Sequence, residues 1–347
     1  MSESQRILVV GPSWVGDMVM AQTLFAELQR QQDCAIDVLA PAWCRPLLSR
    51  MPEVRAPLDL PFDHGDLKLA ARRKLGRSLR GRYDQCFVLP NSLKSALVPF
   101  WARVPVRTGW RGEMRHGLLN DVRVLDKQRY PLMVQRFVAL ASPPKASPPP
   151  LETITPPHLV VSEDSLEQAL RAHGLNRDVP VLGLCPGAEF GPAKRWPEYH
   201  YAEVARDWIS TRGGQVWIFG SGKDLPVAEA IRDALPGAQR SSVQLLAGNT
   251  SLEQAVDLLS ATDAVVSNDS GLMHIAAALG RPLVAVYGST SPDFTPPLGS
   301  AVRVVRLGLD CSPCFQRECP LGHLNCLRQL EPARVISALQ DLAVKED

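Results

Sequence analysis

The stretch "RILVVGPSWVGDMVMAQTLFAELQR", residues 6–30, decides the fold. It opens with a short apolar run typical of a buried strand, and from Asp17 onward its apolar residues recur at helical spacing. Gly11 and Gly16 have the spacing of a phosphate-binding P-loop, but Asp17 and Met18 occupy the positions where that loop needs Lys and Ser or Thr. Because a carboxylate repels phosphate, this loop is predicted to face a different ligand.

The same alternation of strand and helix continues along the chain. Further apolar runs are "AIDVLA" (35–40), "DQCFVLP" (84–90), "VPVLGLCP" (179–186), "GQVWIFG" (214–220), "DAVVSND" (263–269) and "PLVAVYG" (282–288), with helical spacing over 92–102, 198–212, 223–235, 251–260 and 270–279. Such alternation predicts parallel sheets covered by helices, in which ligands bind beyond the carboxyl ends of the strands.

A proline-rich segment divides the chain. "SPPKASPPPLETITPP", residues 142–157, has seven prolines and no periodicity, which is typical of a stiff linker. We therefore predict an α/β protein with two Rossmann-like doubly wound domains, residues 1–141 and 158–347, facing a central cleft. The last helix can pack back on the first domain.

The composition is that of a soluble protein. The chain has 347 residues, 45% of them hydrophobic and 21% charged, and no run approaches the roughly 18–20 apolar residues of a membrane span. The N-terminus lacks the features of a signal peptide, so a cytoplasmic location is expected. The net charge of +2 conceals +9 in residues 1–150 and −7 in the remainder. The basic half, densest in "LKLAARRKLGRSLRGR" (67–82), indicates either an anionic partner or a solvated helix face.

A glycine-rich loop in the second half carries two cations. In "VLGLCPGAEFGPAKRWP" (181–197), Gly187 and Gly191 precede Lys194 and Arg195. Glycine lets the backbone approach a diphosphate closely, and the cations can neutralise it. A surface loop with two solvated charges is the alternative.

A second strand end lies in "DAVVSNDSGLMHIAAALG" (263–280), where Asp269 or Ser270 is predicted to cap the helix that follows. The free N–H groups of a helix N-terminus suit a phosphate, and Asn268 and Asp269 would then face sugar hydroxyls. His274 lies one turn into this helix. A plain cap and a buried core histidine are the alternatives.

A third strand-end loop, "WIFGSGKD" (217–224), offers Lys223 or Asp224 to a ribose, although a turn and a helix cap would explain it as well. Together the three loops predict a nucleotide-sugar site in the second domain. Its predicted donor-binding residues are Gly187, Ala188, Lys194, Arg195, Gly220, Ser221, Lys223, Asp224, Asn268, Asp269, Ser270, Gly271, Met273 and His274.

Half of the eight cysteines are clustered. "CSPCFQRECPLGHLNC" (311–326) contains Cys311, Cys314, Cys319 and Cys326, with His323 among them, while Cys34, Cys44, Cys86 and Cys185 stand in apolar contexts typical of buried thiols. Four soft ligands over this length could hold a structural zinc, and free reduced thiols are the alternative. No catalytic metal and no cofactor are predicted.

Six stretches resemble a known family: "GPSWVGDMVMAQ", "APAWCRPLLSRMPEV", "VLPNSLKSALVPF", "RTGWRGEMRHGLLNDVR", "CPGAEFGPAKRWP" and "SNDSGLMHIAAALGRPLVAVYGSTSPDFTPPL". They resemble the bacterial ADP-heptose:lipopolysaccharide heptosyltransferases of glycosyltransferase family 9. The resemblance implies the GT-B fold. It also implies an inverting transfer of L-glycero-D-manno-heptose from ADP-heptose to heptosyl-Kdo₂-lipid A, in the inner core of Gram-negative lipopolysaccharide. It also implies peripheral contact with the cytoplasmic face of the inner membrane.

The resemblance assigns roles to the unusual residues. An inverting displacement needs a base for the acceptor hydroxyl, and Asp17 fits, although a first-turn acid of its helix is the alternative. Lys194 would stabilise the leaving diphosphate. The predicted acceptor-binding residues are Trp14, Gly16, Asn91, Lys94, Arg107, Arg111 and Arg115, with Arg72, Arg73 and Lys74 behind them.

Several other functions stay open at this point. They are a family 9 transferase with another acceptor, such as a type I heptosyltransferase, a sugar-nucleotide epimerase of the same fold, and a nucleotide-sugar-binding protein without activity. A nicotinamide dehydrogenase is disfavoured because no G-x-G-x-x-G follows the first strand. No nucleic-acid partner is expected, and the protein is predicted to be a monomer.

Overall fold

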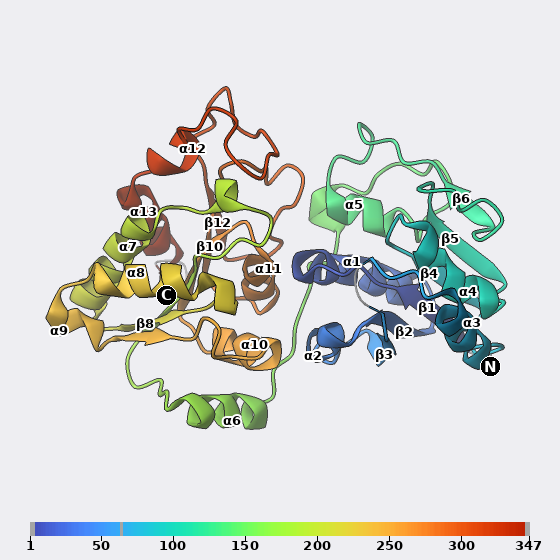
Figure 1. Ribbon diagram of the computed structural model, residues 1–347, viewed down its shortest axis with the longest axis horizontal. Helices are drawn as coiled ribbons and strands as arrows, with labels where there is room; N and C mark the ends of the chain where they lie inside the picture. Colours follow the sequence, from blue (N-terminus) through green and yellow to red (C-terminus); the bar gives the residue numbers. More distant parts are fainter. Residues whose placement is uncertain (1–3, 63–64, 344–347) are drawn as a thin grey trace. The chain divides into compact units, whose positions relative to one another are not determined.

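The chain divides into two compact units in the computed structural model, which describes residues 4–62 and 65–343. The first unit ends at His158 and the second begins at Leu159. Each unit contains one six-stranded sheet with its own helices (Figure 1).

The first unit has a fully parallel sheet in the order β3-β2-β1-β4-β5-β6. Its strands are β1 (Gln5–Val10), β2 (Cys34–Pro41), β3 (Val54–Leu60), β4 (Gln85–Val88), β5 (Val106–Trp110) and β6 (Asp121–Arg123). Its helices are α1 (Val15–Gln31), η1 (Ala42–Cys44), α2 (Arg45–Leu48), α3 (Leu69–Ser78), η2 (Leu93–Ala96), α4 (Leu97–Trp101), α5 (Met133–Val138) and η3 (Leu151–Thr153). The predicted strand and helix around the opening loop are confirmed as β1 and α1.

The second unit repeats this plan with the order β12-β11-β10-β7-β8-β9, again fully parallel. Its strands are β7 (Val181–Cys185), β8 (Gln215–Ile218), β9 (Val243–Leu245), β10 (Ala264–Asn268), β11 (Leu283–Val286) and β12 (Val302–Val305). Its helices are α6 (Glu163–His173), η4 (Pro192–Lys194), α7 (Glu198–Arg212), η5 (Gly222–Asp224), α8 (Leu225–Asp233), α9 (Gly237–Arg240), α10 (Leu252–Ser260), α11 (Gly271–Ala278), α12 (Asn325–Arg328) and α13 (Pro332–Ala343).

Both sheets have the Rossmann strand order, so each has a switch point where the order reverses. The switch lies between β1 and β4 in the first unit and between β7 and β10 in the second. Ligands of doubly wound sheets bind outside the carboxyl ends of the strands at this point. The loop with Asp17 follows β1, and the turn with Asp269 follows β10, so both predicted loops lie at a switch point.

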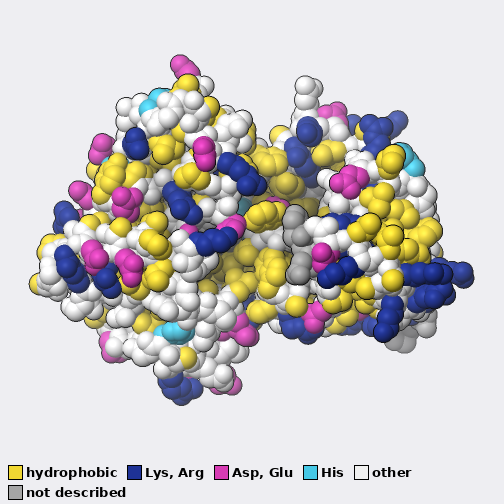
Figure 2. Space-filling view, in the orientation of Figure 1, with side chains coloured by type: hydrophobic (Ala, Val, Ile, Leu, Met, Phe, Trp, Pro, Cys, Tyr) yellow, Lys and Arg dark blue, Asp and Glu magenta, His cyan; other side chains and the backbone are white. Residues whose placement is uncertain are grey.

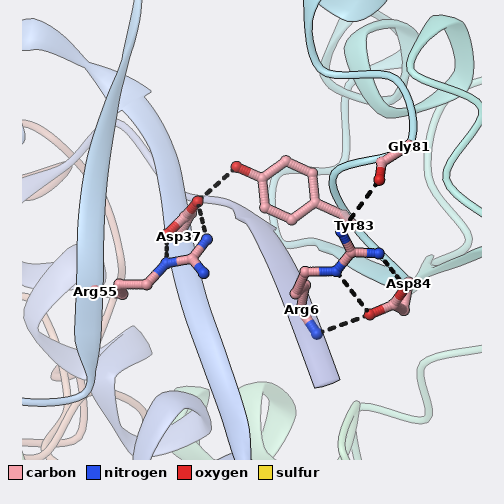
Figure 3. A network of polar contacts seen from close by, with 6 residues as sticks. All are labelled: Arg6, Asp37, Arg55, Gly81, Tyr83 and Asp84. Carbon is pink, nitrogen blue, oxygen red and sulfur yellow. Dashed lines mark hydrogen bonds and ion pairs between the residues drawn. The ribbon is translucent and has the colours of Figure 1, made fainter. Parts of the chain in front are cut away.

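The first sheet also buries a carboxylate that it must compensate. Asp37 on β2 is 1% exposed, and its two oxygens accept hydrogen bonds from the Arg55 guanidinium at 2.8 and 2.6 Å (Figure 3). The Tyr83 hydroxyl donates to it at 2.6 Å. Burial, with this bond to a carboxylate next, raises the pKa of Tyr83. The network joins β2 to β3 and to the segment before β4, and this satisfies a charge that would otherwise destabilise the sheet.

The proline-rich segment is anchored to the first unit. Tyr130 donates its hydroxyl proton to the Ala146 carbonyl at 2.6 Å, and Gln135 donates to the Pro149 carbonyl at 3.1 Å. At its end, the Gln22 amide exchanges two hydrogen bonds with the His158 backbone. The last helix, α13, packs on α7, β11 and β12 of the second unit. Its packing on the first domain stays a prediction.

Candidate donor site and catalytic loop

A buried ion pair lies at the carboxyl edge of the second sheet. Lys194, at the end of η4, places its Nζ 2.6 Å from Asp269 Oδ2, and the two side chains are only 15% and 6% exposed. Thr290, which follows β11, donates its hydroxyl proton to the same oxygen at 2.6 Å. An ammonium has three N–H donors, so after one bond to Asp269 two remain for a ligand.

The turn after β10 presents a helix N-terminus beside this pair. Ser270 caps α11 by accepting a hydrogen bond from the Met273 N–H at 3.4 Å, which decides between the two predicted caps. The first N–H groups of α11 have no partner within the helix and suit an anion. Met273 is fully buried, so no exposed atom of it serves the predicted donor contact.

His274 is a buried neutral group in this region. It is 5% exposed, and burial lowers its pKa to about 4, against a raising effect of Asp269 and together with a lowering effect of Lys194. Near neutral pH it therefore adds no charge to the site. This favours the alternative of a core histidine, although its neutral ring lies within electrostatic reach of the ion pair.

The side chain of Asn268 forms hydrogen bonds inside the fold and does not lie at an open surface. Its side chain is fully buried; Oδ1 accepts hydrogen bonds from Trp196 N at 3.1 Å and the Tyr201 hydroxyl at 3.0 Å. Its Nδ2 donates to the Pro186 carbonyl at 2.6 Å. The amide thereby ties the loop after β7 to the end of β10, so the predicted contact with a sugar hydroxyl would require these bonds to change.

The loop after β8 is held by its own carboxylate. Asp224 Oδ2 accepts hydrogen bonds from Ser221 N at 2.9 Å and Oγ at 2.8 Å, and Oδ1 lies 3.5 Å from the Arg195 guanidinium. A Cβ at Gly187 would lie 2.6 Å from the same carboxylate, so this position requires glycine for close packing. Asp224 therefore caps the turn, which is the predicted alternative to a contact with a ribose.

The remaining donor candidates surround this loop. Lys223 is exposed and pairs with Glu189 at 2.8 Å. Ala188 is buried, whereas Gly220 and Gly271 are partly exposed at strand and helix ends. The structure therefore brings Lys194, Asp269 and the start of α11 together, with Arg195 and Asp224 as a second pair beside them.

In the first unit Asp17 lies in the first turn of α1 and is half-buried. The positive end of the helix dipole stabilises a carboxylate there, so the position agrees with a first-turn acid as well as with a base. Trp14, just before the helix, is 52% exposed, and Gly16 is partly exposed. A Cβ at Gly11 would lie 2.6 Å from Met18 Cε, so the glycine leaves room for the Met18 side chain.

Three acceptor candidates lie on the loops that follow β4 and β5. Asn91 and Arg111 are exposed, and Lys94 is partly exposed in η2. A Cβ at Gly112 would lie 2.2 Å from the Asn91 carbonyl, so these two loops are in close contact. Since β1, β4 and β5 are parallel neighbours, these residues share the sheet edge of Asp17.

Three other predicted arginines are instead used inside the fold. Arg115 is 2% exposed, and its guanidinium donates to the carbonyls of Pro90 and Trp110 and to the Asn91 side chain. Arg107 stands at the start of β5, at the opposite sheet edge, and donates to two backbone carbonyls. Arg72 is 3% exposed and donates to the carbonyls that precede α3, whereas Arg73 and Lys74 are exposed.

Thr290 is a site residue that the sequence analysis missed. Its signal was present, because it follows β11, the neighbour of β10 in the same parallel sheet. Every strand end at that edge is a candidate position, so the loop after β11 is as strong a candidate as the loops after β7, β8 and β10.

Comparison with known proteins gives consistent results. Residues 72–325 match the model of glycosyltransferase family 9 (heptosyltransferase). Lipopolysaccharide heptosyltransferase 2 of Escherichia coli (strain K12) is 53% identical over 350 residues, covering 99% of both chains. The enzyme of the same name from Salmonella typhimurium is 53% identical over 349 residues, covering 98% of this chain and 99% of its own. The solved structure of Escherichia coli ADP-heptose lps heptosyltransferase II matches with a TM-score of 0.88 and 50% identity over 99% of each chain.

The structure has two parallel Rossmann sheets, with a lysine and a helix N-terminus at one switch point. Together with the match to a solved heptosyltransferase, this defines a glycosyltransferase of the GT-B fold. The chain belongs to glycosyltransferase family 9, the heptosyltransferases. The fold class, the enzyme class and the resemblance predicted from six short stretches are therefore confirmed. Within the described residues, no helix is long and apolar enough to cross a membrane.

Proposed function

We propose that this enzyme transfers L-glycero-D-manno-heptose from ADP-heptose to heptosyl-Kdo₂-lipid A with inversion at the anomeric carbon. The observation that carries the proposal is the likeness to a lipopolysaccharide heptosyltransferase 2 over 99% of both chains at 53% identity. The arrangement of the two switch points supports it, because one offers groups for an anion and the other a carboxylate.

The second unit holds the donor in this proposal. The diphosphate lies against the N–H groups that open α11, and Lys194 donates to it with the two N–H bonds not directed at Asp269. Asp269, fixed by Lys194 and Thr290, accepts hydrogen bonds from the heptose. These fixed donors stabilise the charge that develops on ADP as the glycosidic bond breaks.

The first unit supplies the base. The acceptor oxygen attacks the anomeric carbon, its proton passes to the Asp17 carboxylate, and ADP leaves with the electron pair of the glycosidic bond. No cofactor takes part in these steps, and the protein's own cations and N–H groups stabilise the negative charge on the departing ADP. Asp17 regains its ionised form by losing the proton to solvent.

An anionic acceptor accounts for the basic first unit. Figure 2 shows Lys and Arg side chains gathered over α3 and α4. There Arg80, Arg103 and Arg107 line a groove of about 400 Å³ together with Phe100 and Trp101. Burial, followed by the charges of neighbouring arginines, lowers the pKa of Arg80. We assign this face to the anionic surface of the inner membrane, and Lys94 and Arg111 to the acceptor's own phosphates and carboxylates.

The decisive experiment is mass spectrometry of the product formed from ADP-heptose and heptosyl-Kdo₂-lipid A. We expect a gain of one heptose residue together with release of ADP. Conversion of ADP-heptose to another ADP-sugar without release of ADP, or a product formed only on Kdo₂-lipid A, would replace this assignment with an epimerase or with a type I transferase.

The acceptor contacts predict a separate kinetic effect. Reversing both charges in Lys94→Glu/Arg111→Glu is expected to raise the acceptor KM about tenfold, because two exposed charge contacts become repulsive, while the Kd for ADP stays unchanged. Arg171→Glu, at an exposed basic residue of α6 in the second unit, serves as the control. Steady-state kinetics with varied acceptor give the first value and calorimetry the second; an effect confined to ADP binding would place the acceptor elsewhere.

A further inference from the structure

Four cysteines of the second unit lie around one small cavity. Cys311, Cys314, Cys319 and Cys326, here called the cysteine cluster, line a cavity of about 20 Å³ together with His323. All four are free thiols. They come from a segment with little regular structure, in which α12 is the one short helix between β12 and α13.

Packing alone does not explain the cluster. The other four cysteines are buried, as expected of thiols that act as small hydrophobic side chains. Three members of the cluster, Cys311, Cys314 and Cys319, are instead partly exposed, and only Cys326 is buried. The four thiols border one cavity, with Cys326 as its buried member and the other three on its more exposed side.

The chain turns tightly at Cys319. The Gly322 N–H donates to the Cys319 carbonyl at 3.0 Å, and φ is positive at Gly322 (70°) and Leu324 (53°). This turn brings His323 and Cys326 to the cavity that Cys319 lines. A thiolate is the form of cysteine that binds a metal.

We propose that the cysteine cluster binds a single divalent metal ion, Zn²⁺, through four thiolates, with the four protons released to solvent. Four thiolate ligands are typical of structural zinc, and iron is the other metal that such a set accepts. Among the described residues, no three or more Cys, His, Asp or Glu side chains are already arranged to hold a metal. The ion would therefore draw the sulfurs inward as it binds.

The segment also contacts the loops of the proposed donor site, so the metal would act on that site by positioning. The Arg317 carbonyl accepts a hydrogen bond from Ala193 N at 3.1 Å, next to Lys194. A Cβ at Gly191 would lie 2.5 Å from the same carbonyl, so this contact requires glycine. On the other side, Phe315 N donates to the Ser289 carbonyl at 2.7 Å, next to Thr290.

Metal analysis of the purified full-length protein tests the proposal directly. We expect about one zinc per chain in the unaltered protein, and less than about a tenth of that in Cys314→Ser/Cys319→Ser, since two lost thiolates leave too few ligands. Cys34→Ala is the matched control, because Cys34 is a buried cysteine that lies far from the cysteine cluster in the sequence. This variant should keep its zinc. Replacement by Co²⁺ should give sulfur-to-cobalt absorption in the protein and in the control alone.

Three results would overturn the proposal: reduced protein that takes up no Zn²⁺ in competition with a chelating dye, a double variant that retains its metal, or full loading with iron in place of zinc. A second measurement tests the positioning role, which rests on the proposed donor site. Removing the metal should lower Tm and weaken ADP binding. The metal content is measured independently of enzyme activity and of ADP binding. The two proposals can therefore fail separately.

Discussion

Replacing Asp17 with Asn is expected to lower kcat by about a hundredfold or more, as loss of a general base does, while the Kd for ADP stays near its original value. Asn retains the shape of the side chain and can still accept hydrogen bonds, but it cannot take a proton from the acceptor hydroxyl. Single-turnover kinetics with saturating acceptor isolate the chemical step, and calorimetry reports the binding of ADP.

The control for this variant must separate catalysis from helix stability. A first-turn carboxylate stabilises a helix by about 0.3–1 kcal/mol, so a small drop in Tm is expected from Asp17→Asn. Asp33→Asn removes an exposed carboxylate of the same unit outside the loops at the switch point. It should keep its full kcat. Retained turnover in Asp17→Asn would remove Asp17 from the chemistry and leave only its role in α1.

The features that could be predicted from the sequence are local. The strands β1, β7 and β10 are short apolar runs, and α1, α7 and α10 repeat apolar residues over several turns, so their periodicity alone reveals them. The sequence restricts the cap of α11 to Asp269 or Ser270, and the hydrogen bond from Met273 N–H selects Ser270. Because parallel strands bring their carboxyl ends to one edge, these local elements also predict that the loops of the donor site meet.

The features that could not be predicted depend on partners far along the chain. Arg115 has the same charge as Arg111, but its guanidinium binds the carbonyl of Pro90, and only the folded structure reveals this. In the same way Asn268 is used by Trp196 and Tyr201. A polar residue at a strand end is therefore a candidate for either ligand or scaffold, and its burial decides between the two.

Lys194 is expected to have the second large effect. Lys194→Met should weaken binding of ADP-heptose about tenfold to a hundredfold, because a hydrogen bond to a charged group contributes about 1.5–3 kcal/mol. The control is Arg177→Met, since Arg177 is an exposed cation of the same unit that pairs with Glu163 and lies before β7, at the sheet edge opposite the donor loops. It should lower the affinity by less than about threefold, as expected for a solvent-exposed pair.

A double variant separates loss of the phosphate contact from damage to the ion pair. Lys194→Met leaves Asp269 buried without its ammonium, and such a charge destabilises a protein by about 3–5 kcal/mol. Lys194→Met/Asp269→Asn removes both charges, so its Tm should return towards that of the unaltered protein. If Lys194 binds the diphosphate, calorimetry will still show weak affinity of the double variant for ADP, which lacks the heptose that Asp269 is proposed to hold, because the introduced amide cannot replace the missing N–H donors of an ammonium. Recovery of affinity along with Tm would instead show that Lys194 acts only by holding Asp269 in place.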